Sequence, residues 1–148
     1  MSMTTNKTHF LWGYLKLAYI ELQYWLVGLS PEGYYSQKAA VCVGIHEYPR
    51  AIRFLKLSLE STNSAAVRAW LAYCHACQGD WANAAAEYER AGAMRPNRHT
   101  WLAQAEAELR LGNSQKGLEL IAAVEAGNDA LDDATRRSCQ ELRREFAL

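Results

Sequence analysis

The 148-residue sequence has no excess charge of either sign, because 16 lysines and arginines balance 16 aspartates and glutamates. A strong positive field is what attracts nucleic acids and anionic lipids, so its absence argues against a nucleic-acid partner. The sequence also has only three prolines and four cysteines. Four scattered cysteines are too few for the disulfide framework of a small secreted fold, so we expect a reducing, cytoplasmic environment.

Long uninterrupted hydrophobic runs are missing as well. The most apolar stretch extends from Phe10 to Leu29, and Lys16, Glu21 and Gln23 interrupt it. A charge at the centre of a spanning helix costs roughly 2.5–3.5 kcal/mol on insertion scales, and no small-residue cleavage site follows the stretch. We therefore expect no spanning helix. Any membrane association should be peripheral or through a membrane-protein partner.

No catalytic constellation or cofactor motif is present. The four histidines, His9, His46, His75 and His99, lack a paired serine, cysteine or carboxylate pattern, and no glycine-rich phosphate loop occurs. We therefore expect no enzymatic activity and no cofactor.

Cys74 and Cys77 form the single C-x-x-C motif. A structural zinc site needs four ligands, and the remaining cysteines and histidines are distant in sequence. A redox motif belongs at a helix N-terminus beside a strand, whereas this one falls late in a predicted helix. We favour a packing role, and a metal or redox role is the alternative.

A short pattern recurs every 33 residues. Residues 79–84 read GDWANA, residues 112–117 read GNSQKG, and residues 46–51 read HEYPRA as a weaker copy. Glycine accepts the positive φ that ends a helix, and the next Asp or Asn can cap the following helix. The pattern predicts three helix-turn-helix units at about 32–64, 65–97 and 98–131. Such units stack into solenoids, which usually bind other molecules.

The first 30 residues are rich in aromatic side chains and predict one helix over about 7–29. An apolar stripe recurs at spacings of four and three and should be covered by something it packs against: Leu11, Leu15, Ala18, Leu22, Trp25 and Leu29. Its polar edge comprises His9, Gly13, Lys16 and Gln23. Trp12 and Tyr19 fall toward this edge, so they are candidate anchors for a partner, unless the first repeat covers them.

The last segment, residues 132–148, predicts a helix that caps the solenoid. Its predicted apolar side comprises Leu131, Thr135, Cys139, Leu142 and Phe146, and arginines and Glu141 occupy the other side. A polar outer face is expected of a terminal helix, which would otherwise leave the final repeat exposed to water.

The repeated unit resembles the tetratricopeptide repeat (TPR). The second unit matches best, through Leu71, Ala72, Gly79, Asp80, Trp81, Ala84, Tyr88, Ala91 and Pro96. The third matches through Trp101, Ala105, Ala107 and Gly112, with Gln104 and Glu108 at positions expected to be apolar or aromatic. The first keeps Tyr35, Ala39, Tyr48, Ala51 and Leu55. The resemblance, over about 32–131, implies an all-α TPR-like right-handed solenoid of three repeats, flanked by the two extra helices.

The resemblance also implies a concave groove lined by the first helix of each repeat. The corresponding partner-binding candidates are Ala40, Val43, Ala69, Tyr73, Ala76, His99, Leu102, Glu106 and Leu109. None is the Lys, Asn or Arg that some TPR proteins use to grip a C-terminal carboxylate. Such a groove suits an apolar helix or extended segment of a partner. The protein's own N-terminal helix or a neighbouring subunit could equally fill it.

These observations predict a non-catalytic protein–protein interaction module, either an adaptor or an assembly chaperone that holds an apolar segment. One alternative is a small cytoplasmic chaperone resembling the three-repeat TPR chaperones of bacterial type III secretion. Another is a homo-oligomeric scaffold whose N-terminal helices pack together. The sequence does not name the partner.

Overall fold

The computed structural model describes residues 3–126 and 131–147, which form helices and contain no strand. The helices are α1 (Met3–Val27), α2 (Pro31–Gly44), α3 (Tyr48–Ser61), α4 (Ala65–Cys77), α5 (Trp81–Met94), α6 (Arg98–Arg110), α7 (Ser114–Glu125) and α8 (Asp133–Glu145). The predicted turn at Gly127, Asn128 and Asp129 lies outside the described residues.

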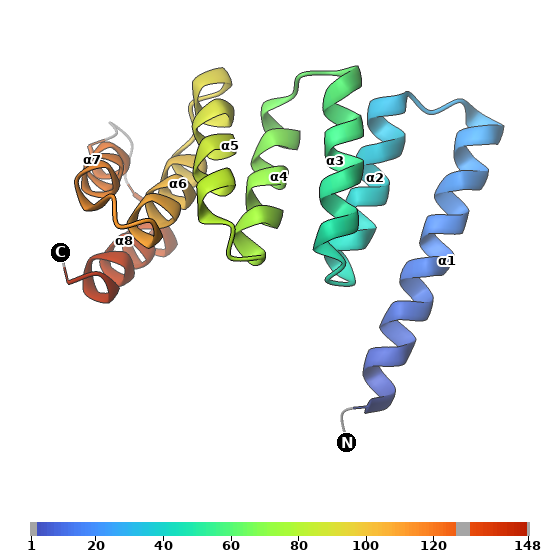
Figure 1. The fold of residues 1–148 in the computed structure, drawn as a ribbon, viewed down its shortest axis with the longest axis horizontal. Coiled ribbons are helices and arrows are strands. Elements are labelled where there is room, and N and C mark those ends of the chain that lie inside the picture. The colour runs from blue at the N-terminus through green and yellow to red at the C-terminus, as the bar shows by residue number, and fades with distance from the viewer. Residues whose placement is uncertain (1–2, 127–130, 148) are drawn as a thin grey trace.

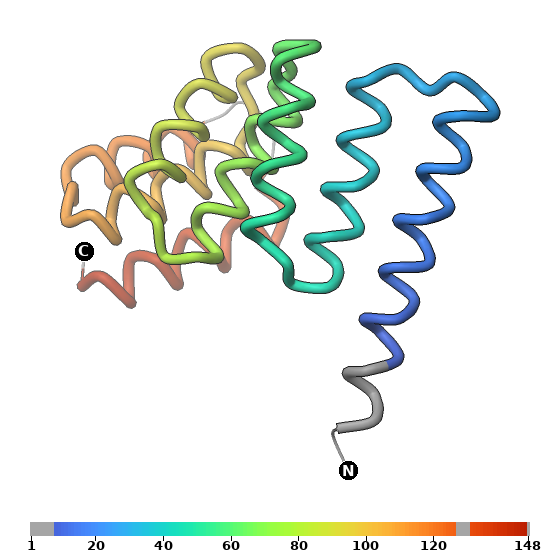
Figure 2. Tube along the Cα trace, turned by 45° about the vertical axis from the view of Figure 1, so that its right-hand side comes forward, coloured from blue at the N-terminus to red at the C-terminus, as the bar shows by residue number. Residues whose placement is uncertain are grey.

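The helices form antiparallel pairs that stack side by side (Figure 1). The pairs are α2 with α3, α4 with α5, and α6 with α7. Helix α1 packs against α2 at one end of the stack, and α8 packs against α6 at the other (Figure 2). The predicted all-α solenoid with one extra helix at each end is confirmed.

The three repeat turns share one backbone geometry. His46, Gly79 and Gly112 have φ values of 59°, 74° and 84°, so each takes the left-handed conformation. The next residue then donates its N–H to a carbonyl in the last turn of the helix: Glu47 to Cys42 at 2.8 Å, Asp80 to His75 at 3.0 Å, and Asn113 to Glu108 at 2.9 Å. This is the helix-ending bond of a Schellman motif. The predicted turn role of His46 is therefore confirmed.

We expect His46→Gly to raise the free energy of unfolding by about 0.5–1 kcal/mol. Glycine removes the cost of a side chain at positive φ, partly offset by loss of the 3.0 Å bond between His46 Nδ1 and the Tyr48 hydroxyl. Gly79→Ala should lower the free energy of unfolding by about 1 kcal/mol, because alanine is strained at positive φ. Urea denaturation measures both changes, and a destabilised His46→Gly protein would contradict the geometry.

Small residues bring the two helices of each repeat together. Ala51, Ala84 and Gly117 are buried at the predicted close approaches. A Cβ added at Gly117 would lie 2.5 Å from Leu109 Cδ2. Leu109 is itself 4% exposed and belongs to the core between α6, α7 and α8. Its predicted place in the groove is wrong, because α7 and α8 both pack around this end of α6.

The polar residues in the third repeat are buried but satisfied. Glu108 accepts hydrogen bonds from Asn113 Nδ2 at 2.7 Å and pairs with Lys116 Nζ at 2.8 Å. Burial alone would raise the pKa of Glu108, but the bonds from Lys116 and Asn113 hold it below its ordinary value. The carboxylate thus stays charged and fastens the α6–α7 turn.

Helix α1 packs on α2 through a face that differs from the predicted stripe. Gly13, Leu17 and Ile20 are buried, whereas Leu11, Leu15, Leu22 and Trp25 are exposed. This face packs on α2 because Gly13 has no side chain and lets Ile45 lie directly against the backbone of α1. A Cβ added at Gly13 would lie 2.5 Å from Ile45 Cγ2. The predicted stripe does not pack on the other helices of the chain and stays exposed. No helix in the described part of the chain is long and apolar enough to cross a membrane.

Candidate functional site

Three hollows follow one another along helices α2, α4, α6 and α8, and we call them together the inner row. The α2–α4 hollow, of about 270 Å³, is lined by Ser36, Leu55, Ala66, Val67 and Trp70, among others. The α4–α6 hollow, of about 360 Å³, is lined by Tyr73, Ala76, Cys77, Trp81, Tyr88, Ala103 and Glu106. The α6–α8 hollow, of about 330 Å³, shares Ala103 and Glu106 with it. The last two hollows are therefore neighbours, separated by Ala103 and Glu106.

Most of the predicted groove residues lie along these helices, but not all of them line the inner row. Tyr73, Ala76, His99, Leu102 and Glu106 line it. Ala40 lines a different hollow, between α1 and α2. Val43 and Ala69 are partly buried and line none of these hollows, and Leu109 lies in the core.

Two aromatic side chains of α4 dominate the exposed surface of the inner row. Tyr73 is 48% exposed beside the α4–α6 hollow, and Trp70 is 45% exposed beside the α2–α4 hollow. Sequence reasoning missed Trp70, because the TPR register assigns the groove to Ala69. The signal available in the sequence was the tryptophan itself, which stands next to the assigned groove residue Ala69. A large aromatic side chain at such a position is a common interface anchor.

The charges along the inner row are acidic. Its linings include Glu32, Glu106, Glu141 and Glu145, and no Lys, Arg or Asn. Arg110 lies at the border, paired with Glu145 at 2.7 Å and Glu106 at 3.6 Å, with its guanidinium 5.5 Å from the Trp81 ring centre. The linings of these three hollows therefore include no Lys, Asn or Arg that could donate to a carboxylate.

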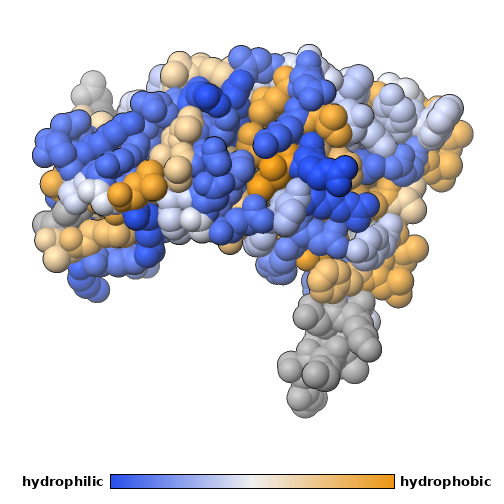
Figure 3. Space-filling view, viewed as in Figure 1, coloured by the Kyte–Doolittle hydropathy of each residue, from blue (hydrophilic) through white to orange (hydrophobic). Residues whose placement is uncertain are grey.

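A separate hollow, of about 750 Å³, lies between α1 and α2. Trp12, Lys16 and His9 of α1 line one side, and Ala40 and Ile45 of α2 line the other. The structure thus brings together one residue from each predicted partner-binding set, Trp12 from the N-terminal helix and Ala40 from the groove. Tyr19 is exposed elsewhere on α1. Apolar surface gathers over α1 at the right-hand edge of Figure 3.

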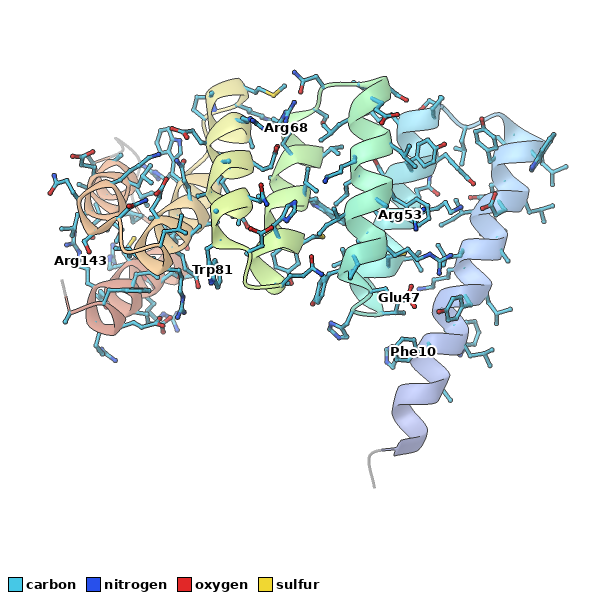
Figure 4. The ribbon with its side chains drawn as sticks, in the orientation of Figure 1. Phe10, Glu47, Arg53, Arg68, Trp81 and Arg143 are labelled. Carbon is cyan, nitrogen blue, oxygen red and sulfur yellow. The ribbon has the colours of Figure 1, made fainter. Side chains whose placement is uncertain are left out.

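A polar cluster fixes α1 to the repeats. Glu21 of α1 forms an ion pair with Lys38 of α2 and accepts a 2.6 Å hydrogen bond from the Tyr34 hydroxyl. Nearer the N-terminus, the Tyr14 hydroxyl donates to Glu47 at 2.7 Å, and Figure 4 shows Glu47 pointing toward α1 from the turn before α3. These contacts make α1 a fixed part of the fold.

Cys74 and Cys77 occupy different environments. Cys74 is fully buried in the core, and burial raises the pKa of its thiol to about 11, which makes it a poor nucleophile. Cys77 is exposed and lines the α4–α6 hollow. Within residues 3–126 and 131–147, no three His, Cys, Asp or Glu side chains converge to hold a metal ion.

The arrangement is similar to that of a solved structure, the TPR domain of Sgt2 from Aspergillus fumigatus. The two share 17% identity with a TM-score of 0.70, over 80% of this chain and 81% of that one. No family model matches the sequence, and no curated protein is detectably similar to it. At such low identity the likeness concerns the fold. The chain is a helical solenoid with the fold of a TPR domain.

Proposed function

We propose that this protein is a non-catalytic, cytoplasmic protein-binding module that holds an apolar helix or extended segment of a partner in the inner row. TPR folds typically serve as interaction modules, and the role would be that of an adaptor or an assembly chaperone. The observation that carries the proposal is the exposure of Trp70 and Tyr73 beside two hollows of the row. Half-exposed aromatic side chains next to hollows are the usual anchors of protein interfaces.

The acidic residues of the inner row indicate which kind of partner segment would fit it. Glu32 and Glu141 line its two ends, and the linings contain no lysine or arginine. An acidic partner segment would meet repulsion there, whereas lysines or arginines beside an apolar stretch would find carboxylates. The best-fitting partner segment is therefore apolar with basic flanks.

Photo-crosslinking from the inner row tests the proposal. A photoreactive phenylalanine analogue replaces Tyr73 in the full-length protein, and the crosslinked partner peptide is identified by mass spectrometry from native cells. The same analogue at Met94, which is 43% exposed at the end of α5, is the matched control. We expect Tyr73 to crosslink at least about tenfold more of one partner than Met94 does, at an apolar segment with basic flanks.

The reciprocal variant carries Trp70→Glu and Tyr73→Glu, which removes both aromatic anchors and places charges where the apolar stretch would pack, without changing a buried residue. This variant should lose the partner, whereas Met94→Glu should retain it. Equal crosslinking from positions 73 and 94, or a crosslinked segment rich in acidic residues, would refute binding in the inner row.

A further inference from the structure

The two terminal helices of the solenoid have different outer faces. Helix α8 exposes Arg136, Arg137 and Arg144, the polar outer face of a cap. Helix α1 exposes a continuous set of large apolar side chains, each between 54% and 83% accessible: Leu11, Trp12, Leu15, Tyr19, Leu22, Trp25, Leu26 and Val27. The N-terminal end of the solenoid is therefore uncapped.

The exposed residues of α1 follow the spacing of a coiled coil. Leu11, Leu15, Ala18, Leu22 and Trp25 alternate at four and three residues, and a second row at intervals of seven runs beside them: Trp12, Tyr19 and Leu26. We call these two rows the heptad face. Gly13, Leu17 and Ile20, which pack toward α2, project from roughly the opposite side of the helix. A heptad face is shaped to receive another helix with the same spacing.

The exposed area is large enough for a stable dimer. At their observed accessibilities, the eight exposed side chains present on the order of 1,000 Å² of mostly apolar surface. A standard interface buries about 800 Å² on each partner. The largest apolar patch on an ordinary monomer covers only about 300–600 Å². A second copy brings an identical face, so the requirement is met without any other protein.

The charges on α1 favour a second copy over a membrane surface. Helices that lie on membranes carry many lysines and arginines beside their apolar face, whereas the sequence of α1 has two lysines, Lys7 and Lys16, and no arginine. No charged residue interrupts the heptad face, so two copies meet without repulsion of like charges. Figures 1 and 2 both show α1 at the edge of the fold, with its other side clear of the remaining helices.

We propose that two copies of this chain pair through the heptad face of α1 about a two-fold axis, and that the inner row of each copy stays open. The heptad face points away from the repeats, so pairing places the two solenoids on opposite sides of the helix pair. The dimer then presents two separate inner rows. A partner with two binding segments, or a partner that is itself oligomeric, gains avidity from this arrangement.

Light scattering coupled to size-exclusion chromatography tests the pairing with the full-length protein. The wild-type mass should be twice the 16.7 kDa of one chain at micromolar concentration. Leu15→Glu with Leu22→Glu should raise the dissociation constant at least about 100-fold and give monomers. Both leucines are exposed in the single chain, so circular dichroism should show unchanged helix content.

A matched control adds the same two charges elsewhere, as Met94→Glu with Leu111→Glu, at residues that are also partly exposed. This control should remain dimeric. A monomeric wild type at high micromolar concentration, or a Leu15→Glu, Leu22→Glu protein that remains dimeric, would overturn the pairing. Flotation of monomeric wild type with phosphatidylserine vesicles, abolished by the two α1 substitutions, would also overturn it and assign the face to a membrane. Crosslinking from Tyr73 is read separately, so the two proposals can fail independently.

Discussion

Leu55→Ala is expected to lower the free energy of unfolding by about 3 kcal/mol. Leu55 of α3 is 1% exposed and is among the largest fully buried side chains. Removing buried methyl groups costs their transfer free energy plus the cavity left behind, about 2–5 kcal/mol for Leu→Ala. Leu55 lies in a core cluster that includes Leu17 of α1, Cys42 of α2 and Val67 of α4. The substitution therefore weakens the contact between the first two repeats as well as the first repeat itself.

Urea denaturation followed by circular dichroism measures this loss as a lower midpoint with an unchanged slope. Leu111→Ala is the matched control, because Leu111 is 42% exposed beside the last repeat turn. The control should cost under about 1 kcal/mol. Equal losses for the two substitutions would show that Leu55 is not packed as the structure has it.

The repeat turns could be predicted from sequence because they depend on local backbone chemistry. Positive φ at His46, Gly79 and Gly112 is set by the residues of each turn. The side of α1 that packs on α2 depends instead on tertiary contact. Both sides of α1 are apolar, and Gly13 decides between them because it lets Ile45 approach most closely. A glycine counted as part of the polar edge is in fact the point of contact.

The groove could be predicted only in part, for a related reason. The repeat register placed Tyr73, Ala76 and Glu106 on one surface, and all three line the α4–α6 hollow, because those helices have neighbours on both sides as in a regular repeat. The prediction that Leu109 lies in the groove is wrong because α8, a helix that the repeat pattern does not include, covers this part of α6. Trp70 was missed because register alone does not show how far a large side chain extends from its helix. Errors thus arise where non-repeat helices or large side chains change the surface.

The inner row and the heptad face lie on different parts of the molecule, so they can act together. In the function proposed above, the repeats would hold the partner segment, and α1 would set how many copies of the repeats are presented at once. The pairing of two copies depends on how firmly α1 is fixed to α2. We expect the contact between Glu21 and Lys38 to contribute to this attachment, because it joins the two helices through a charge that is largely removed from water.

Lys38 is only 8% exposed, and its ammonium lies 4.7 Å from the Tyr34 ring centre and 4.8 Å from that of Phe54. Burial would lower the pKa of Lys38, but hydrogen bonds with Glu21 and Tyr34 raise it above its ordinary value. Hydrogen bonds from Lys38 and Tyr34 lower the pKa of Glu21. A lowered carboxyl pKa stabilises the folded state above the ordinary value of about 4.3, and this is lost as pH falls through the folded value. Docking of α1 should therefore weaken at acidic pH.

Glu21→Lys is expected to destabilise the docking of α1 by about 2 kcal/mol. The substitution leaves the buried Lys38 ammonium without its carboxylate and adds a second positive charge beside it. Breaking a fully buried pair costs about 3–5 kcal/mol, and the smaller figure allows for Glu21, whose side chain is 47% exposed and screened by water. Hydrogen exchange should rise in α1, whereas α4 to α7 should stay protected because they do not contact this cluster.

Glu60→Lys is the matched control, because it makes the same charge change at an exposed residue near the end of α3. It should leave exchange in α1 unchanged. The double variant Glu21→Met, Lys38→Met replaces the ion pair with apolar side chains of similar length, and it should restore most of the protection, since no buried charge remains. If Glu21→Lys left α1 as protected as the wild type, the ion pair would not be what fixes this helix. If Glu21→Lys raised hydrogen exchange in α1 and also shifted the dimer toward monomer, pairing of two copies would be shown to depend on the docking of α1 to α2.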